Sequence, residues 1–141
     1  MEGSGEPGGS PGLGDRGVSP KFVPAGLAEL QRIGLLAELP GETLVRLAQR
    51  MRREQVAAGG AVVEEGDDGD RFYVVLTGMF TVSQASMGPR SVLRPGDYFG
   101  EVALTMDVPR TASVRALTQA TVASCDRETF DEFIRPLFAD S

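Results

Sequence analysis

The stretch of sequence that decides the fold is residues 99–116, which read FGEVALTMDVPRTASVRA. Gly100 stands where a β-type segment gives way to a short helical one, so the helix would begin with unpaired backbone amides. Such amides, together with the helix dipole, favour an anion. Because Gly100 has no β-carbon, a ligand can approach the backbone closely. The start of this helix therefore predicts a site for a negatively charged ligand.

Two charged side chains in the same stretch narrow the chemistry of that ligand. Arg110 follows Pro109, and a planar guanidinium can donate two parallel hydrogen bonds to a phosphate. Glu101 lies in the first turn of the expected helix, where its carboxylate would repel a phosphate and needs a donor of its own. A ribose hydroxyl is such a donor, so this combination predicts a sugar phosphate. Taken singly, Arg110 could be a surface arginine and Glu101 could simply complement the helix dipole.

The residues around this stretch have the pattern of a β-protein. Short segments rich in β-branched and aromatic residues alternate with turns made of glycine, proline and aspartate. We expect strands at residues 55–57, 61–64, 72–76, 80–84, 91–93, 113–116 and 121–125. Several short strands with regular turn signals predict a barrel or a sandwich.

Helical patterns flank the expected strands. Residues 24–51 carry apolar side chains at helical spacing in two stretches, which Pro40 and Gly41 separate. The apolar positions are Leu27, Leu30, Ile33, Leu35 and Leu36 in the first stretch, and Leu44, Leu47, Ala48 and Met51 in the second. Residues 100–106 form the internal helix, and residues 128–138 a C-terminal helix that Pro136 should kink or end. The predicted fold is α+β and mainly β: a β-barrel or jelly roll of about eight short strands with N-terminal helices, an internal helix and a C-terminal helix.

The composition excludes several classes of protein. The chain has 141 residues, which suits one domain, and it contains no histidine and a single cysteine. An imidazole base, a histidine-ligated metal, an intramolecular disulfide and a thiolate zinc cage are therefore excluded. The net charge of −6 argues against direct nucleic-acid binding. No apolar run approaches the ~20 residues that span a bilayer, so we expect a cytoplasmic domain that does not itself contact a membrane.

The N-terminal segment differs from the rest in composition. Residues 1–20 include seven glycines, three prolines and three serines, and few large apolar side chains. Such a segment cannot bury enough surface to offset its ordering entropy. We expect a disordered tail or linker at 1–20 and a single domain at 21–141.

The stretch at 99–116 closely resembles the phosphate-binding cassette of cyclic nucleotide-binding domains, the regulatory modules of cyclic-nucleotide-dependent kinases, gated channels and catabolite-activator-type regulators. The family pattern is Phe-Gly-Glu, a small residue and leucine, a variable loop, then Pro-Arg-(Thr/Ser/Ala)-Ala and Ser/Thr-Val, and this chain matches it without a gap. Residues 65–67, 72–75, 78 and 95–99 also resemble the family's barrel, and residues 37–48 its N-terminal helices. The similarity covers about residues 27–138.

The resemblance implies a set of ligand-binding residues. They are Val82, Leu93, Gly100, Glu101, Val102, Ala103, Leu104, Arg110, Thr111 and Ala112. Arg110 would pair with the cyclic phosphate, and Glu101 would accept a hydrogen bond from the ribose 2′-hydroxyl. Amides near Ala103, Leu104 and Ala112 would complete the phosphate site, with Gly100 close to the ribose.

The remaining positions concern the base. Thr111 occupies the position where a hydroxyl can contact the phosphate and, in some members, the guanine amino group. Val82 and Leu93 match positions that flank the purine. The implied ligand is cyclic AMP, with cyclic GMP as the second choice.

The function implied by the resemblance is that of a regulatory sensor without catalysis and without a cofactor. Its effector, whether kinase, channel, transporter or other, is not identified by the sequence. Family members usually carry a further helix that covers the base, and this sequence ends at Ser141, so we expect an excised domain or a lid from a partner.

Three other interpretations stay open. A DNA-binding regulator of the catabolite-activator type would need a helix-turn-helix, and no basic helical segment is found in the sequence. A barrel enzyme of the cupin kind would need histidine metal ligands, which are absent. A degenerate interaction domain that binds no ligand is disfavoured because Glu101 and Arg110 are both present.

Overall fold

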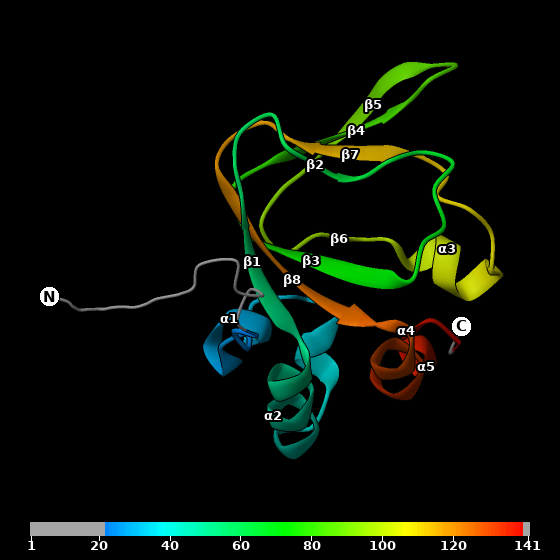
Figure 1. Cartoon of the computed structure of the whole chain (residues 1–141). Helices are drawn as coiled ribbons and strands as arrows, with labels where there is room; N and C mark the ends of the chain where they lie inside the picture. The colour runs from blue at the N-terminus through cyan, green and yellow to red at the C-terminus, as the bar shows by residue number, and fades with distance from the viewer. Residues whose placement is uncertain (1–21, 140–141) are drawn as a thin grey trace, which may run out of the picture.

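Two four-stranded antiparallel sheets face each other and form the central part of the molecule (Figure 1). The computed structural model describes residues 22–139, so the expected tail at 1–20 lies outside the described residues. One sheet has the order β1-β8-β3-β6, and the other has the order β2-β7-β4-β5. The strands are β1 (Arg52–Val56), β2 (Ala61–Val63), β3 (Arg71–Thr77), β4 (Phe80–Gln84), β5 (Gly88–Leu93), β6 (Tyr98–Phe99), β7 (Ser113–Ala116) and β8 (Ala120–Asp126).

The predicted fold class, mainly β with flanking helices, is confirmed. Strands β4 and β7 have the predicted bounds, whereas β1 begins three residues earlier than predicted, at Arg52. Its register against β8 runs from Arg52 opposite Ser124 to Val56 opposite Ala120. This strand is mostly polar, so tertiary pairing and not alternation of apolar residues extends it. A β-type segment was expected directly before Gly100, where β6 lies, but no bounds were predicted for it, because a strand of only two residues carries no periodicity.

Alternation along β3 divides the interior into two apolar clusters. Phe72 and Val74 pack against the helices, and Tyr73 and Val75 point into the space between the two sheets. All four side chains are at most 8% exposed. Successive strand residues face opposite sides, so a strand covered on both sides is apolar at every position. This central strand therefore links the barrel interior to the helical layer.

Helices cover the outer face of the sheet that contains β3 and β8 (Figure 1). The N-terminal ones are α1 (Leu27–Gln31), the 3₁₀ turn η2 (Leu36–Glu38) and α2 (Gly41–Arg50). Leu30, Ile33 and Leu36 are buried as expected, but Leu27, the first residue of α1, is 38% exposed. No helix within residues 22–139 combines the length and apolar character needed to cross a membrane.

The C-terminal helix is continuous but changes its winding. It consists of α4 (Arg127–Thr129), the π-helical segment η3 (Phe130–Ile134) and α5 (Arg135–Ala139). Pro136 was expected to kink or end the helix, and it lies at the second position of α5, directly after the π segment. Proline lacks the N–H that an α-helix would use at this point, and a π turn accommodates this irregularity. The helix therefore continues past Pro136.

The internal helix α3 (Glu101–Met106) lies at one end of the barrel, between β6 and the segment that leads into β7. Figure 1 shows it on the same side of the molecule as the C-terminal helix. Ala103 and Leu104 are its buried residues. The predicted stretch thus becomes a helix that separates the barrel interior from the C-terminal helical layer.

Candidate ligand-binding site

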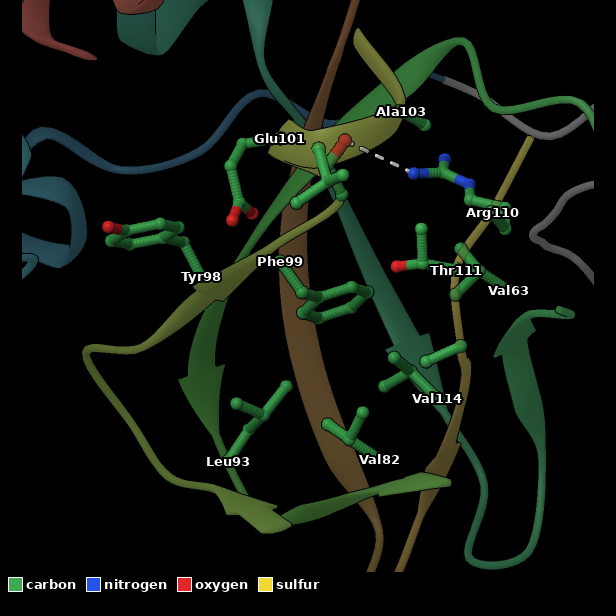
Figure 2. A pocket seen from close by; sticks show the side chains of 13 residues that line it. Val63, Val82, Leu93, Tyr98, Phe99, Glu101, Ala103, Arg110, Thr111 and Val114 are labelled. Atoms are coloured by element: carbon green, nitrogen blue, oxygen red, sulfur yellow. Dashed lines mark hydrogen bonds between the residues drawn. The ribbon is translucent and has the colours of Figure 1, made fainter. Parts of the chain in front are cut away.

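A cavity lies between α3 and the inner side of the barrel. Its lining residues are Val63, Val82, Leu93, Tyr98, Phe99, Gly100, Glu101, Val102, Ala103, Arg110, Thr111, Ala112 and Val114 (Figure 2). The structure brings together every residue predicted for the site except Leu104. The lining residues come from five strands (β2, β4, β5, β6 and β7), from the start of α3 and from the segment before β7, so the site exists only in the folded barrel.

Polar and apolar groups occupy different parts of this cavity. Figure 2 shows Arg110 and Thr111 on one side and the Glu101 carboxylate on the other, near Tyr98. Val82 and Leu93 lie together at the end of the cavity farther from α3. The cavity therefore offers a cation, an anion and an apolar end in separate places.

Arg110 is held in place by both its backbone and its side chain. Its amide donates to the Asp67 carbonyl at 2.8 Å, and its carbonyl accepts from the Gly66 amide at 2.9 Å. Its guanidinium donates from Nη1 to the Gly100 carbonyl at 3.3 Å and from Nη2 to the Arg71 carbonyl at 2.9 Å. These contacts fix the orientation of the fork before any ligand is present.

The Arg110 guanidinium is a buried cation. The residue is 7% exposed, and burial lowers the pKa of its guanidinium, whereas electrostatic interactions with Tyr73, Asp70 and Glu101 oppose this effect. Arginine nevertheless stays protonated at neutral pH. Within residues 22–139, no carboxylate lies within ion-pair distance of it. A buried charge without an opposite charge is costly, so this position favours an incoming anion.

An aromatic stack supports the guanidinium. The Tyr73 ring lies 5.9 Å from Arg110 Cζ and stacks on Phe99, with ring centroids 4.9 Å apart and planes 6° from parallel. The face of an aromatic ring attracts a cation. Burial is the largest influence on Tyr73 and raises the pKa of its hydroxyl, so the ring stays neutral.

Two features of the backbone at the start of α3 require glycine at position 100. Its φ of 97° is left-handed, a conformation that other residues adopt with strain. A β-carbon here would also lie 2.8 Å from the Arg71 carbonyl oxygen and 2.9 Å from Arg110 Nη1. The chain therefore needs glycine both to enter the helix and to leave room for the arginine.

Glu101 is the first residue of α3, and it is half-buried. Burial raises the pKa of its carboxyl above the ordinary value of 4.5, while its own backbone amide and the charge of Arg110 oppose that rise. Apart from its own backbone amide, no donor to its carboxylate is found among the described residues. A half-buried acceptor on the wall of a cavity suits a hydroxyl donor from a ligand.

Leu104 is the predicted site residue that does not line the cavity. Its side chain is fully buried in the apolar cluster between the sheet and the helices. Successive helix residues point about 100° apart, so Leu104 turns away from the cavity-lining Ala103 and packs toward the helical layer. Its side chain therefore packs in the core, and any part in the site is limited to its backbone.

Four lining residues were missed by the sequence reasoning: Val63, Tyr98, Phe99 and Val114. Phe99 and Tyr98 directly precede Gly100, so proximity in sequence was an available signal. Val63 and Val114 lie on paired strands, β2 and β7, whose register brings them opposite each other. That pairing joins residues about fifty positions apart, and no local pattern reveals it.

The segment that carries Arg110 and Thr111 is also tied to its neighbours through side chains. Gln84 Nε2 donates to the Thr111 carbonyl at 2.9 Å, and the Ser113 hydroxyl accepts from the Glu65 amide at 2.8 Å. One bond comes from β4 and the other from the turn after β2, so two separate parts of the chain hold the segment. No group of histidine, cysteine, aspartate and glutamate side chains in the described part of the chain is arranged to hold a metal ion.

The comparison with known families matches one family. The cyclic nucleotide-binding domain matches residues 53–136, which contain the cavity and all of the strands from β2 to β8. Curated relatives include the cAMP-dependent protein kinase regulatory subunits of Eremothecium gossypii, 38% identical over 108 residues, and Yarrowia lipolytica, 37% identical over 109 residues. Each match covers 77% of this chain but only 24% and 29% of the relative. The chain thus spans about a quarter of the length of these relatives.

Solved structures with a similar fold include two that cover most of this chain. The regulatory domain of Toxoplasma gondii PKA in complex with cAMP has a TM-score of 0.74 and 28% identity, over 79% of this chain and 44% of that chain. The N-terminal domain of a transcriptional regulator from Streptomyces coelicolor A3(2) has a TM-score of 0.66 and 31% identity, over 79% of this chain and 81% of that chain. This chain is therefore similar in fold both to a kinase regulatory domain and to a domain of a transcriptional regulator.

Proposed function

The chain belongs to the cyclic nucleotide-binding domain family, and we propose that it binds a cyclic nucleotide, cyclic AMP before cyclic GMP, in the cavity beside α3. One observation carries this proposal: Arg110 is a cation only 7% exposed, beside the amides of a helix start, with no carboxylate of residues 22–139 within ion-pair distance. An anion of phosphate chemistry is the partner that this arrangement favours.

The proposed binding mode assigns each part of the ligand to one part of the cavity. The phosphate pairs with Arg110, whose hydrogen bonds to Gly100 and Arg71 use one N–H of each terminal nitrogen and leave further donors for an anion. The amides of α3 near Ala103, and that of Ala112, complete the phosphate contacts. Glu101 accepts from the ribose 2′-hydroxyl. The base lies between Val82 and Leu93 at the apolar end.

The contacts of this binding mode are sufficient for micromolar affinity. A hydrogen bond to a charged group contributes about 1.5–3 kcal/mol, and micromolar affinity needs about −8 kcal/mol in total. The Arg110 and Glu101 contacts supply a large part of this, and burial of the base supplies more. No single contact has to be unusually strong.

Titration calorimetry with cyclic AMP and cyclic GMP tests the proposal. We expect micromolar or tighter binding of cyclic AMP, and Arg110→Ala should weaken it by about 100-fold or more because it removes the charged partner from a buried site. The matched control is Arg115→Ala on β7, an exposed arginine that donates to the Gly59 carbonyl and does not line the cavity. If neither nucleotide binds below about 1 mM, the proposal fails. If Arg110→Ala leaves the affinity unchanged, the phosphate is misplaced.

We infer that the domain is regulatory and has no catalysis of its own, and that it acts in the cytoplasm. The matched curated relatives are named as regulatory subunits of a kinase, which supports this role. The effector that it controls is an attached domain or a separate protein.

A second candidate is the sensor part of a DNA-binding transcription regulator of the catabolite-activator type. The Streptomyces coelicolor match favours it, because that solved domain is the N-terminal part of a transcriptional regulator and is 81% covered. A helix-turn-helix encoded directly downstream in the same gene would decide for this candidate, and a kinase-anchoring or channel segment would decide against it.

A further inference from the structure

The C-terminal end of α3 is held by contacts from outside the helix. This helix has only six residues, so its own backbone hydrogen bonds cannot fix it, and its orientation depends on contacts at its ends. Asp107 follows it with a left-handed φ of 54°, which turns the chain away from the helix axis. The amides of Asp107 and Val108 both donate to the Ala103 carbonyl, and Pro109 has no amide proton. The Leu104 carbonyl therefore lacks the usual donors from the residues that follow it.

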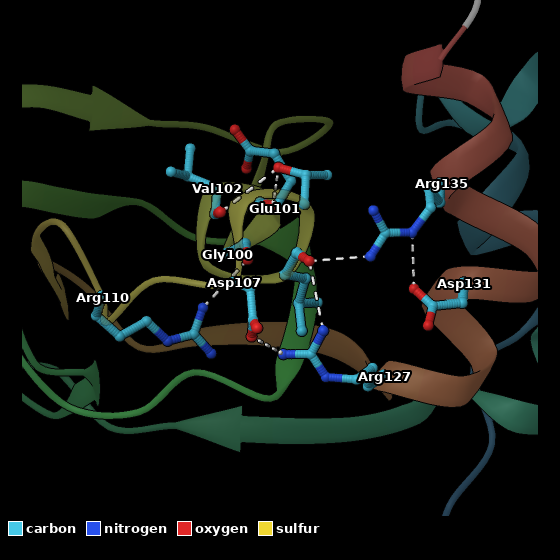
Figure 3. A network of polar contacts seen from close by, with 10 residues as sticks. Gly100, Glu101, Val102, Asp107, Arg110, Arg127, Asp131 and Arg135 are labelled. Carbon is cyan, nitrogen blue, oxygen red and sulfur yellow. Dashed lines mark hydrogen bonds and ion pairs between the residues drawn. The ribbon is translucent and has the colours of Figure 1, made fainter.

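Two arginines of the C-terminal helix supply the missing donors. Arg135 Nη2 donates to the Leu104 carbonyl oxygen at 2.9 Å, and Arg127 Nη1 donates to the same oxygen at 3.4 Å (Figure 3). Leu104 is fully buried, so this oxygen would otherwise be an unsatisfied buried acceptor. Two cations also complement the negative end of the α3 dipole.

Each arginine is itself held in position. Arg135 Nε donates to Asp131 Oδ1 at 2.9 Å, and Arg135 Cζ lies 5.6 Å from the centroid of the Phe130 ring. Arg127 Nη2 lies 3.6 Å from Asp107 Oδ1, just beyond the end of α3. These contacts restrict the rotamers of both side chains and lower the entropy lost in reaching α3.

We propose that Arg135, assisted by Arg127, is a positioning residue for the ligand: it holds the C-terminal end of α3 so that Gly100 and Glu101, at the other end, face the cavity. This inference rests on the proposed function and adds the group that sets the orientation of the binding helix. The two ends of α3 lie about 9 Å apart at 1.5 Å per residue, so a tilt at one end moves the other.

The proposal has a thermodynamic consequence. The contact joins the ligand-binding helix to the C-terminal helix, so ligand binding and docking of the C-terminal helix stabilise each other to the same extent. Breaking the contact therefore weakens ligand binding without touching any residue that lines the cavity.

The test compares Arg135→Gln with Arg50→Gln. Arg50 is the matched control because it also contacts the C-terminal helix, pairing with Glu132 at 2.7 Å and lying 5.2 Å from the Phe133 ring centroid, while none of its polar or ring contacts within the described residues reaches α3. We expect Arg135→Gln to weaken binding of cyclic AMP by about 5- to 10-fold and Arg50→Gln to change it by less than about 2-fold. Arg135→Lys should recover part of the affinity, because it keeps the charge and one donor.

A second nucleotide distinguishes positioning from general loss of stability. With 2′-deoxy cyclic AMP, which lacks the hydroxyl assigned to Glu101, Arg135→Gln should lose less affinity than with cyclic AMP. The preference for the 2′-hydroxyl therefore shrinks in this variant and stays intact in Arg50→Gln. Equal losses for the two nucleotides, or equal effects of the two substitutions, would overturn the proposal.

Hydrogen exchange gives a readout that needs no ligand. In the free protein, amides 101–106 should exchange faster in Arg135→Gln than in the wild type, and not in Arg50→Gln. If Arg135→Gln does not fold, Arg127→Gln takes its place in the same measurements. If the wild type binds no cyclic nucleotide, the proposed function fails, whereas normal binding by Arg135→Gln with unchanged exchange overturns only this inference.

Discussion

The guanidinium of Arg110 lies directly against the α-carbon of Gly69. A β-carbon on Gly69 would be 2.5 Å from Arg110 Nε and 2.7 Å from Arg110 Cζ, and 2.8 Å from the β-carbon of Ala103. Gly69 is buried in the turn between β2 and β3, and its backbone is not in the left-handed region, so glycine is needed here for space and not for conformation. The turn and the arginine thus depend on each other's shape.

Gly69→Ala should therefore impair ligand binding. The added methyl group displaces the Arg110 side chain from its contacts with Gly100 and Arg71, and we expect affinity for cyclic AMP to fall by about 10-fold or more. Calorimetric titration measures this. Gly34→Ala is the control, because a β-carbon at Gly34 meets nothing within 4 Å. Full affinity in Gly69→Ala would show that Arg110 can adopt another productive orientation.

Ligand binding should depend on pH through Glu101. Burial raises the pKa of this carboxyl above its ordinary value of 4.5, and only the ionised form accepts the ribose hydroxyl without a competing proton. Affinity should therefore rise with pH as the solution passes through the raised pKa, with proton release on binding. Calorimetry in two buffers of different ionisation enthalpy measures both effects. Glu101→Gln should bind more weakly with no such dependence, and a pH-dependent Glu101→Gln would point to another group.

The same raised pKa predicts the effect of Glu101 on stability without ligand. Between the unfolded pKa and the higher folded pKa, the folded state holds more protons, so the free energy of unfolding falls as the pH rises through this window. Glu101→Gln removes this penalty, so the variant should be more stable than the wild type at pH 7. The difference should vanish below pH 4.5. Urea unfolding at both pH values measures it, with exposed Glu38→Gln as the control.

Thr111 should affect the choice between nucleotides. Its side chain lines the cavity beside Arg110 (Figure 2), and a hydroxyl oxygen there can accept a hydrogen bond from the guanine amino group, which has no equivalent at that position on adenine. Thr111→Ala should weaken binding of cyclic GMP by about 5-fold or more relative to cyclic AMP. Thr81→Ala on β4 is the control, since that hydroxyl donates to the Arg115 carbonyl and lies outside the cavity lining. An unchanged ratio would remove Thr111 from base recognition.

Cys125 should be unreactive in the folded protein. It is fully buried on β8, and burial raises the pKa of its thiol from 9.0 to about 12. The thiolate is the reactive form, so iodoacetamide at pH 8 should label Cys125 only when the domain opens. Mass spectrometry should show slow labelling in buffer and rapid, complete labelling in denaturant. Rapid labelling in buffer would mean that the β8 region opens easily.

Much of the site was predictable because its polar groups are close together in sequence. Gly100, Glu101 and Arg110 lie within eleven consecutive residues, and the chemistry of phosphate and ribose recognition needs such groups together. The helix start at Gly100 follows from local rules of glycine and helix capping. The strands show how far local patterns reach: β4 and β7 were predicted with their bounds, whereas β6 had no predicted bounds, because its register against β3 holds it.

By itself, the sequence determined the mainly β fold class, the positions of most strands and the closeness of Glu101 and Arg110 along the chain, because alternation, turn residues and helix starts are local properties. The tertiary structure decided which α3 side chains face the cavity and which pack in the core. It placed Leu104 in the core with its carbonyl on two arginines, Gly69 against Arg110, and Val63 opposite Val114. These relationships join segments far apart in the chain, and only packing and strand pairing bring them together.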